Sequence, residues 1–498
     1  MNVKSVQSVF MFKSFVFRIY IVALVLRLIP VILARGLGIG LDDMFQYDML
    51  ARSIVAGNGF RWYAQDDLNQ LASFVDFDLS TVKEYDPVRG VPTSFRAPLY
   101  PAFLALVYFF SGTEFTRFFA ARLAQAIFLG APLAPLTYWV SKRLFHLPLG
   151  EGRARVEGAA RISAWIVACY PMLLLYPLGL ATENAFLILL LSSIFFLLRS
   201  YEHPATLNFL LVGFLLALTA LTRSVILPFA GLAIVWMCFS LKRKSGAILV
   251  AIAFALTISP WIIRNSLLHQ KLTGIETAMG YALYVSYHPQ GNGSMFFGPS
   301  LDLVPILDDA ERDRIGTQKA IEFIRAQPER FIPLAINRLG FFFGLEKRVL
   351  MYFYSNNLVG YIHLPLLLAI SAVLLLPFVI ISISAAFGLT ILCRRPKHIL
   401  LGLLFIGYTL PHIFIISEDR FHLTLVPYIA ILAAQFWVNG FCVLFARWNE
   451  SLTGKIIVSF VVFAVFLLLF NWGWELSRDA DKISQLLGPN GNQSHFPY

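Results

Sequence analysis

Two adjacent aspartates, Asp42 and Asp43, directly follow the first apolar stretch of this 498-residue chain. Carboxylates this close repel each other and lose hydration near lipid, so their pKa values are expected to leave the ordinary range. Acids perturbed in this way are typical of groups that move protons in catalysis. One of the two fits a helix N-cap, a position that aspartate favours, but capping does not account for a pair.

A third acid, Glu183, stands between two later apolar stretches, in the string LATEN. At the start of a helix it would be stabilised by the helix dipole. It would equally serve as a second functional acid facing Asp42 and Asp43 across a cavity, and the residues alone leave both interpretations open.

Four arginines lie at the same ends of apolar stretches as these acids, where a membrane protein has little reason to keep basic residues. Guanidinium groups bind phosphate oxygens in pairs of hydrogen bonds, so together they could form a pocket for a phosphate or pyrophosphate. For any single one, an ion pair or interfacial snorkelling is an equal alternative. The four are Arg96, Arg223, Arg264 and Arg420.

Three further side chains join the candidates through their neighbours in the chain: Tyr47 after the aspartates, Tyr100 after Arg96, and His422 after Arg420. Neither His422 nor the other lone histidine of interest, His288, has a second possible metal ligand at the spacing of a metal site. A divalent metal is compatible with the acids, although nothing in the sequence requires one. P-loop, G-x-S-x-G, CxxC and HExxH patterns are absent from the sequence.

The composition places these residues in a membrane protein. Hydrophobic residues make up 58% of the chain and charged residues 14%, and the mean hydropathy is +0.70. The apolar residues come in runs of about 20, the length that crosses a bilayer. The net charge of +11 comes from basic clusters at the ends of these runs, which indicates orientation in a membrane and not nucleic-acid binding.

The sequence predicts an all-α polytopic protein with about eleven membrane spans in one catalytic domain, residues 1–475, and a short tail, 476–498. Basic clusters such as Lys242-Arg243-Lys244 all fall on one side, which is therefore predicted to be cytoplasmic. The predicted spans are 15–35, 118–141, 158–176, 182–199, 206–222, 224–241, 246–263, 361–392, 398–416, 422–446 and 455–473.

Two long loops, 36–117 and 265–360, are predicted on the outer, extracytoplasmic side, as is the tail. In the first, an amphipathic helix after Asp43 is expected to lie on the membrane surface and to stop at Gly57-Asn58-Gly59. The apolar segment Pro98–Gly112 is too short to span, and is predicted to be a juxtamembrane or re-entrant helix. In the second loop, a charged helix is expected over 308–327.

The order of these motifs resembles that of the membrane-embedded glycosyltransferases of the GT-C class. Within it, the chain is most similar to family 39, which includes the protein O-mannosyltransferases and the aminoarabinose transferase of lipid A. The resemblance covers about residues 15–435. It consists of LDDMFQY with AGNGF, FRAPLYPAFLALVYFFSG, ATENAFLILLL, LTRSVILPF, SPWIIRN and EDRFHLTLVPYIAILAA.

The resemblance implies transfer of a sugar from a polyprenyl-phosphate carrier, with inversion, to a lipid, glycan or protein acceptor at the extracytoplasmic face. It implies that Asp43 is the base, although Met44 stands where the family has a second acid and Asp42 is the alternative. Glu183 matches the second-loop acid, and Arg96 the residue that contacts the carrier phosphate. A bacterial inner membrane with the site facing the periplasm fits the family, whose members differ in metal dependence.

Other functions remain open. A transporter or flippase of a lipid-linked or anionic solute would also use arginines at the outer face, although the spans show neither charges near their middle nor repeated breaks at Gly and Pro. A glycan ligase or polymerase with the same fold, and a non-catalytic scaffold, are further alternatives.

Overall fold

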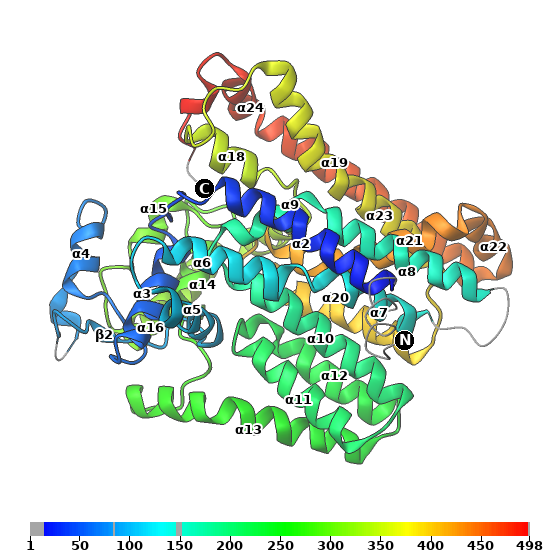
Figure 1. Ribbon diagram of the computed structural model, residues 1–498, viewed down its shortest axis with the longest axis horizontal. Helices are drawn as coiled ribbons and strands as arrows, with labels where there is room; N and C mark the ends of the chain where they lie inside the picture. Colours follow the sequence, from blue (N-terminus) through cyan, green and yellow to red (C-terminus); the bar gives the residue numbers. More distant parts are fainter. Residues whose placement is uncertain (1–13, 83–84, 146–151, 497–498) are drawn as a thin grey trace, which may run out of the picture.

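The computed structural model describes residues 14–82, 85–145 and 152–496. It is a bundle of long helices, several of which, such as α2 (Phe15–Leu33), α19 (Leu364–Gly388) and α23 (Leu452–Arg478), run obliquely from upper left to lower right in Figure 1. Within the described residues the only paired strands are β1 (Arg61–Trp62) and β2 (Val91–Pro92), which form a short antiparallel ribbon. The prediction of an all-α membrane protein is confirmed.

Eight helices of the described residues are long and apolar enough to cross a membrane. A ninth span is possible if α8 (Gly152–Cys169) and the segment Pro171–Leu178 count as one, since the chain bends by 51° between them. The eight are α2 (Phe15–Leu33), α6 with η2 and α7 (Arg117–Leu144), α10 (Thr182–Glu202), α13 (Lys244–His269), α19 with η6 (Leu364–Ile391), α20 (Pro396–Phe414), η7 with α21 (Phe421–Asn439) and α23 (Leu452–Arg478).

The predicted count of eleven therefore needs correction. The predicted spans 206–222 and 224–241 are helices, α11 (Thr206–Ala220) and η4 with α12 (Ser224–Phe239), but both are too short to meet the length expected of a span. The predicted span 422–446 ends at Asn439, because Gly440 takes a positive φ of 67° and a separate helix, α22 (Cys442–Glu450), follows. The helix α19 continues through Pro377 without a break.

The first loop carries the candidate acids on α3 (Asp43–Val55), and α3 ends just before Gly57, which has a positive φ of 76°. Its apolar face does not lie on lipid as predicted. Tyr47 and Ala51 pack instead on Tyr100 and Leu104 of the short apolar helix α5 (Leu99–Ser111). The other elements of this loop are α4 (Gln65–Leu71) and η1 (Leu79–Thr81).

The second loop is mostly helical, and the helix predicted over 308–327 is present as α16, with Asp308 as its N-cap. The bounds of its elements are α14 (Met279–Tyr287), α15 (Phe297–Leu301), α16 (Asp309–Ala326), η5 (Pro328–Arg330), α17 (Phe331–Phe342) and α18 (Arg348–Ser355). Figure 1 shows α3 to α5 and α14 to α16 gathered at one end of the bundle, which we call the loop end.

Basic connections meet at the opposite end. Glu202 forms ion pairs with Arg143 and with Lys397, whose Nζ lies 2.7 Å from the Glu202 carboxylate. Three connections that the charge pattern placed on one side of the membrane are thus in contact. The basic residues Lys4 and Lys13 of the N-terminus lie outside the described residues.

The predicted tail is helical and packed. It contains the end of α23, then α24 (Ala480–Leu487) and η8 (Gly491–Gln493), and Leu486 and Phe496 pack against Leu350 and Tyr354 of α18. The tail therefore lies on the second loop. The division into a domain 1–475 and a tail stays a prediction.

Arg27 is a charged side chain inside the span α2. Arg27 of α2 is fully buried and its guanidinium donates to the carbonyls of Ala23, Val167 and Ala168 at 3.1–3.2 Å. The carbonyl of Val167 lacks a helical donor because the residue four positions on is Pro171, which has no N–H. Arg27 thus satisfies the backbone at the bend after α8.

Replacing Arg27 by methionine is expected to lower the free energy of unfolding by about 2–3 kcal/mol, because buried carbonyls would lose a charged donor. Thermal unfolding in detergent would measure the change. The exposed Arg35, at the end of the same helix, is the matched control, and an Arg35→Met variant should unfold like the wild type. An Arg27→Met variant as stable as the wild type would contradict this role.

Candidate functional site

The two aspartates have different partners although they are neighbours. Asp42 is the N-cap of α3, and its Oδ1 accepts a hydrogen bond of 2.8 Å from the backbone N–H of Met44. Asp43, the first residue of the helix, forms ion pairs with Arg96 through Oδ1 and with Arg420, 3.1 Å away, through Oδ2. The capping explanation therefore applies to Asp42 only, and Asp43 bridges arginines from distant parts of the chain.

The position of Arg96 depends on aromatic rings and on the docking of α5. Its guanidinium lies over the rings of Tyr47 and Phe95, at 5.2 and 5.1 Å, and its Nε donates to Gln46 at 2.8 Å. The backbone N–H of Leu99 donates to the carbonyl of Leu221 at the end of α11, 3.0 Å away. This contact places the Arg96 segment beside the turn that carries Arg223.

A second carboxylate, Glu183, lies in the first turn of α10 and is 3% exposed. Arg223 forms an ion pair with its Oε1, and Nε of Arg420 lies 3.9 Å from the same oxygen. The ring of Phe421 lies under both guanidinium groups, at 4.9 and 5.5 Å. Glu183 is thus joined to Asp43 through Arg420.

Glu418 extends the same network. Its Oε2 lies 2.7 Å from Nε of Arg420 and 2.9 Å from Nη1 of Arg348. The partnership of Glu418 with Arg420 is a local one, since the two residues are two positions apart in the chain. Arg348, at the start of α18, was not foreseen, because it lies in the second loop, outside the predicted spans. The apolar run VLMYFY directly after it is the signal that could have found it.

Together these eight residues form what we call the charged cluster. It lies at the loop end and combines four guanidinium groups with four carboxyl groups. Its arginines and Asp43 keep 17–29% of their side-chain surface exposed, so a ligand can reach them. The members are Asp42, Asp43, Arg96, Glu183, Arg223, Arg348, Glu418 and Arg420.

The charges of the cluster shift the two aspartates in opposite directions. Burial and the neighbouring charge of Asp43 raise the pKa of Asp42 above its ordinary value. Burial acts in the same direction on Asp43, but the guanidinium groups of Arg96 and Arg420 outweigh it and hold the pKa of Asp43 well below its usual range. Asp43 is therefore ionised at neutral pH, and both of its carboxylate oxygens form ion pairs with arginines.

The two candidate tyrosines lie beneath this cluster. Tyr47 meets Tyr100 edge to face, with ring centroids 5.1 Å apart, and burial raises the pKa of Tyr47 to about 12. The hydroxyl of Tyr100 donates to Gln125, 2.8 Å away, which also accepts from Asn184 at 3.0 Å. These contacts hold together the helices that carry Asp43 and Glu183. The raised pKa values keep both tyrosines protonated at neutral pH, so their role here is structural.

Two of the predicted site residues are not part of the cluster. Arg264 donates to the carbonyls of Thr93 and Phe60, at 2.5 and 3.2 Å. His422 is fully buried between Glu346, 3.0 Å away, and the carbonyl of Phe342, at 2.7 Å. Arg264 lies within α13 and His422 within η7, and their hydrogen bonds go to backbone carbonyls and to Glu346 instead of to the acids of the cluster.

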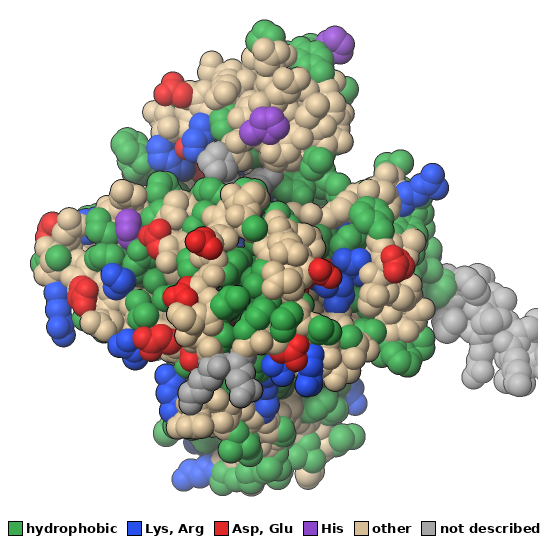
Figure 2. Space-filling model, turned by 90° about the vertical axis from the view of Figure 1, so that its left-hand side faces the viewer, with side chains coloured by type: hydrophobic (Ala, Val, Ile, Leu, Met, Phe, Trp, Pro, Cys, Tyr) green, Lys and Arg blue, Asp and Glu red, His purple; other side chains and the backbone are tan. Residues whose placement is uncertain are grey.

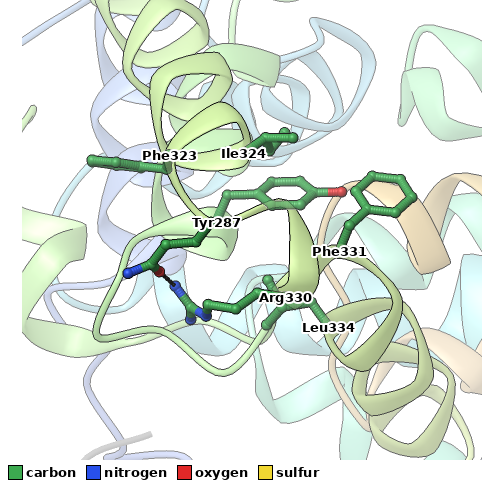
Figure 3. Close-up of a pocket in the computed structure, with 7 residues that line it drawn as sticks. Tyr287, Phe323, Ile324, Arg330, Phe331 and Leu334 are labelled. Carbon is green, nitrogen blue, oxygen red and sulfur yellow. Dashed lines mark hydrogen bonds between the residues drawn. The ribbon is translucent and has the colours of Figure 1, made fainter.

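A small cavity in the second loop is separate from the cluster. Figure 3 shows it beside the ring of Tyr287, and Arg330 at its rim donates to Gln327 over 2.9 Å. Its volume of about 10 Å³ holds one water molecule at most. It is lined by Tyr287, Phe323, Ile324, Gln327, Arg330, Phe331 and Leu334.

The surface of the loop end carries charges of both signs. Figure 2 shows acidic and basic side chains scattered among hydrophobic ones on this face. Within the described residues, no three His, Cys, Asp or Glu side chains are grouped so that they could hold a metal ion. The chemistry of the cluster is that of carboxylates and guanidinium groups.

The loss of one buried carboxylate should be costly to the fold. A Glu183→Gln variant is expected to lower the free energy of unfolding by about 3 kcal/mol, since Arg223 would keep a buried charge without its partner. The exposed pair of Glu311 and Arg314 on α16 offers the control, because Glu311→Gln should change stability by less than about 0.5 kcal/mol. Equal thermal unfolding of the two variants would contradict the buried ion pair.

Comparison with known proteins identifies no family. The sequence matches no protein-family profile and no curated protein. Two solved structures overlap with this chain: ArnT from Cupriavidus metallidurans bound to undecaprenyl phosphate, and the same protein in the apo state. The first is 12% identical over 84% of this chain and 77% of that chain, with a TM-score of 0.37.

The apo structure is 13% identical over 83% of this chain and 76% of that chain, with a TM-score of 0.36. TM-scores this low do not establish a common fold.

Proposed function

We propose that this protein is a glycosyltransferase of the GT-C class that moves a sugar from a polyprenyl-phosphate carrier to an acceptor hydroxyl. The observation that carries the proposal is the placement of Asp43 between Arg96 and Arg420, all three partly exposed at the loop end. A base and two phosphate-binding groups thus share one site. The order of sequence motifs that resembles family 39 supports the same assignment.

The arginines would bind the phosphate of the carrier. Guanidinium groups form paired, charge-assisted hydrogen bonds with phosphate oxygens. These donors form ion pairs with Asp43, so a phosphate would replace Asp43 as the partner of Arg96 and Arg420. Arg223 and Arg348 extend the positive surface next to this position, and Glu183 and Glu418 hold three of the arginines in place.

Asp43 would become a base when the phosphate takes over its arginines. The loss of two guanidinium partners raises the pKa of a carboxylate, so Asp43 would gain basicity only in the donor complex. It then accepts the proton of the acceptor hydroxyl while the hydroxyl oxygen bonds to the anomeric carbon. The bond from that carbon to the phosphate oxygen breaks, its electron pair stays on the phosphate, and the anomeric centre is inverted.

The arginines also stabilise the leaving group. Polyprenyl phosphate departs with the negative charge that develops on its oxygen, and guanidinium groups already in place stabilise this charge without a separate acid. Asp42 is the second candidate for the base, since burial and the charge of Asp43 raise its pKa, and a raised pKa makes a carboxylate more basic. Asparagine variants of the two aspartates separate the two roles.

The test of the proposal is turnover of a donor. Purified protein in nanodiscs would be incubated with a panel of polyprenyl-phosphate sugars and short lipid, glycan and peptide acceptors, and release of polyprenyl phosphate would be followed. Sugar-dependent release supports the transferase. Uptake of the lipid-linked sugar across a proteoliposome membrane without release would favour a transporter or flippase instead.

The orientation is part of the same proposal. The loop end would face the outside of a bacterial inner membrane, with the basic end that contains Arg143 and Lys397 in the cytoplasm. Cysteines introduced at the exposed positions Asp66 and Arg35 near the loop end should react with a membrane-impermeant maleimide in intact spheroplasts. A free acceptor lipid, glycan or protein would then meet the site from that side.

A further inference from the structure

A buried carboxylate of the second loop holds the three residues that precede Arg96. Oδ2 of Asp309, at the start of α16, accepts hydrogen bonds from the hydroxyl of Thr93 at 2.5 Å and from the backbone N–H groups of Ser94 and Phe95, at 2.6 and 3.1 Å. One carboxylate oxygen thus binds three consecutive residues of the first loop, 214 to 216 positions away in sequence.

Three further backbone groups of this segment are also bound. The N–H of Thr93 donates to the carbonyl of Phe60 at 3.2 Å, and its carbonyl accepts from Arg264 at 2.5 Å. The carbonyl of Ser94 accepts from the N–H of Thr277, 3.0 Å away. The segment is therefore held by the first loop, by the end of α13 and by the second loop at once.

The burial of this contact makes it unusual. Asp309 is 2% exposed and Thr93 and Ser94 are fully buried. The second oxygen of the carboxylate, Oδ1, has no hydrogen-bond partner among the described residues. A buried carboxylate with an unsatisfied oxygen destabilises a fold, so a role beyond local stability accounts better for an acid at this position.

We propose that Asp309 is a positioning residue for the donor-phosphate site, because it holds Thr93–Phe95 and thereby sets the place and direction of Arg96. The inference rests on the proposed function. The Arg96 guanidinium is 5.1–5.2 Å from two rings and 2.8 Å from Gln46, so a shift of its backbone would move it off the phosphate position. Arg264 belongs to the same arrangement and acts through the Thr93 carbonyl.

The experiment measures binding of sugar-free polyprenyl phosphate to the full-length protein in nanodiscs. Asp309→Leu is expected to weaken binding about tenfold or more, in the range that a misplacement of about 1 Å produces. Asp309→Asn should retain most of the affinity, since its amide oxygen can accept the same hydrogen bonds. Thr93→Val, which removes one of the three, is a milder variant that should weaken binding about threefold.

A double-mutant cycle shows whether the effect passes through Arg96. In an Arg96→Gln background, Asp309→Leu and Thr93→Val should have no further effect on binding. The matched control is Asp313→Asn on the same helix, whose carboxylate accepts from the N–H of Gly280 at 2.6 Å and does not touch the Arg96 segment. It should bind as the wild type does.

Two results would overturn the inference. One is full additivity of the Arg96 and Asp309 variants, or of the Arg96 and Thr93 variants, since the loss would then come from general damage to the fold. The other is wild-type affinity in both Asp309→Leu and Thr93→Val. A wild-type protein that binds no polyprenyl phosphate would instead refute the proposed function itself, and this outcome is distinct from both.

Discussion

An Asp43→Asn variant should lose sugar transfer while it still binds polyprenyl phosphate. Without the carboxylate, the acceptor hydroxyl has no base, and the loss of general-base catalysis lowers kcat by about 10²–10⁴-fold. The donor should bind several-fold more tightly than to the wild type, because Asp43 no longer competes with the phosphate for Arg96 and Arg420. Release of polyprenyl phosphate and equilibrium binding of the sugar-free carrier would measure the two quantities.

Two further variants show whether Asp43 is the base: Asp42→Asn tests the alternative, and Asp66→Asn is the control. Asp42→Asn should keep most of the activity if Asp43 is the base, whereas loss of activity in Asp42→Asn alone would move that role by one residue. Asp66→Asn replaces an exposed aspartate of the same loop and should behave as the wild type. If Asp43→Asn bound the carrier more weakly than the wild type, the idea that Asp43 occupies the phosphate position would be wrong.

An Arg96→Gln variant should lose donor binding instead. A charge-assisted hydrogen bond contributes about 1.5–3 kcal/mol, so the loss of a guanidinium that binds phosphate should raise the Kd for polyprenyl phosphate by about 10²-fold. Arg96→Lys keeps the charge but not the paired hydrogen bonds, and an intermediate Kd is expected. The affinity for the acceptor should stay unchanged in both, as measured from initial rates at saturating donor.

The control for Arg96 is another arginine of the first loop. Arg61 donates to the carbonyl of Gly90 at 3.1–3.2 Å and takes no part in the charged cluster, so Arg61→Gln should bind the carrier normally. Thermal unfolding of each variant shows whether a loss of binding reflects a loss of fold. A folded Arg96→Gln protein with an unchanged Kd would remove Arg96 from the phosphate site.

Much of the fold follows from local sequence. Apolar runs with basic ends predicted the helices that are long and apolar enough to cross a membrane, and each of the eleven predicted spans falls on helical segments. The charged helix after Asp308 and the stop of α3 before Gly57 were predicted correctly, because N-capping and positive-φ glycines act within a few residues. The number of spans was not, since α11 and α12 are helices too short to cross alone.

The sequence predicted where helices form better than it predicted what their apolar faces pack against. Tyr47 and Ala51 form an apolar stripe that sequence alone assigns to lipid, yet α5 covers it. A stripe of this kind needs only an apolar partner, and periodicity does not distinguish a bilayer from another helix. Arg27 illustrates the same limit, because the carbonyls that bind it belong to a bend 140 residues further along the chain.

By itself, the sequence determined which groups this protein has for chemistry and at which ends of its helices they stand: the pair Asp42-Asp43, Glu183, and arginines beside apolar runs. Only the tertiary structure decided their partners. Asp43 pairs with Arg420, 377 positions away in the chain. Arg264 binds backbone carbonyls instead of an acid, and Arg348, which was not predicted, pairs with Glu418. The reason is physical: caps and hydrophobic periodicity act over a few residues, whereas an ion pair forms wherever packing brings two charges together.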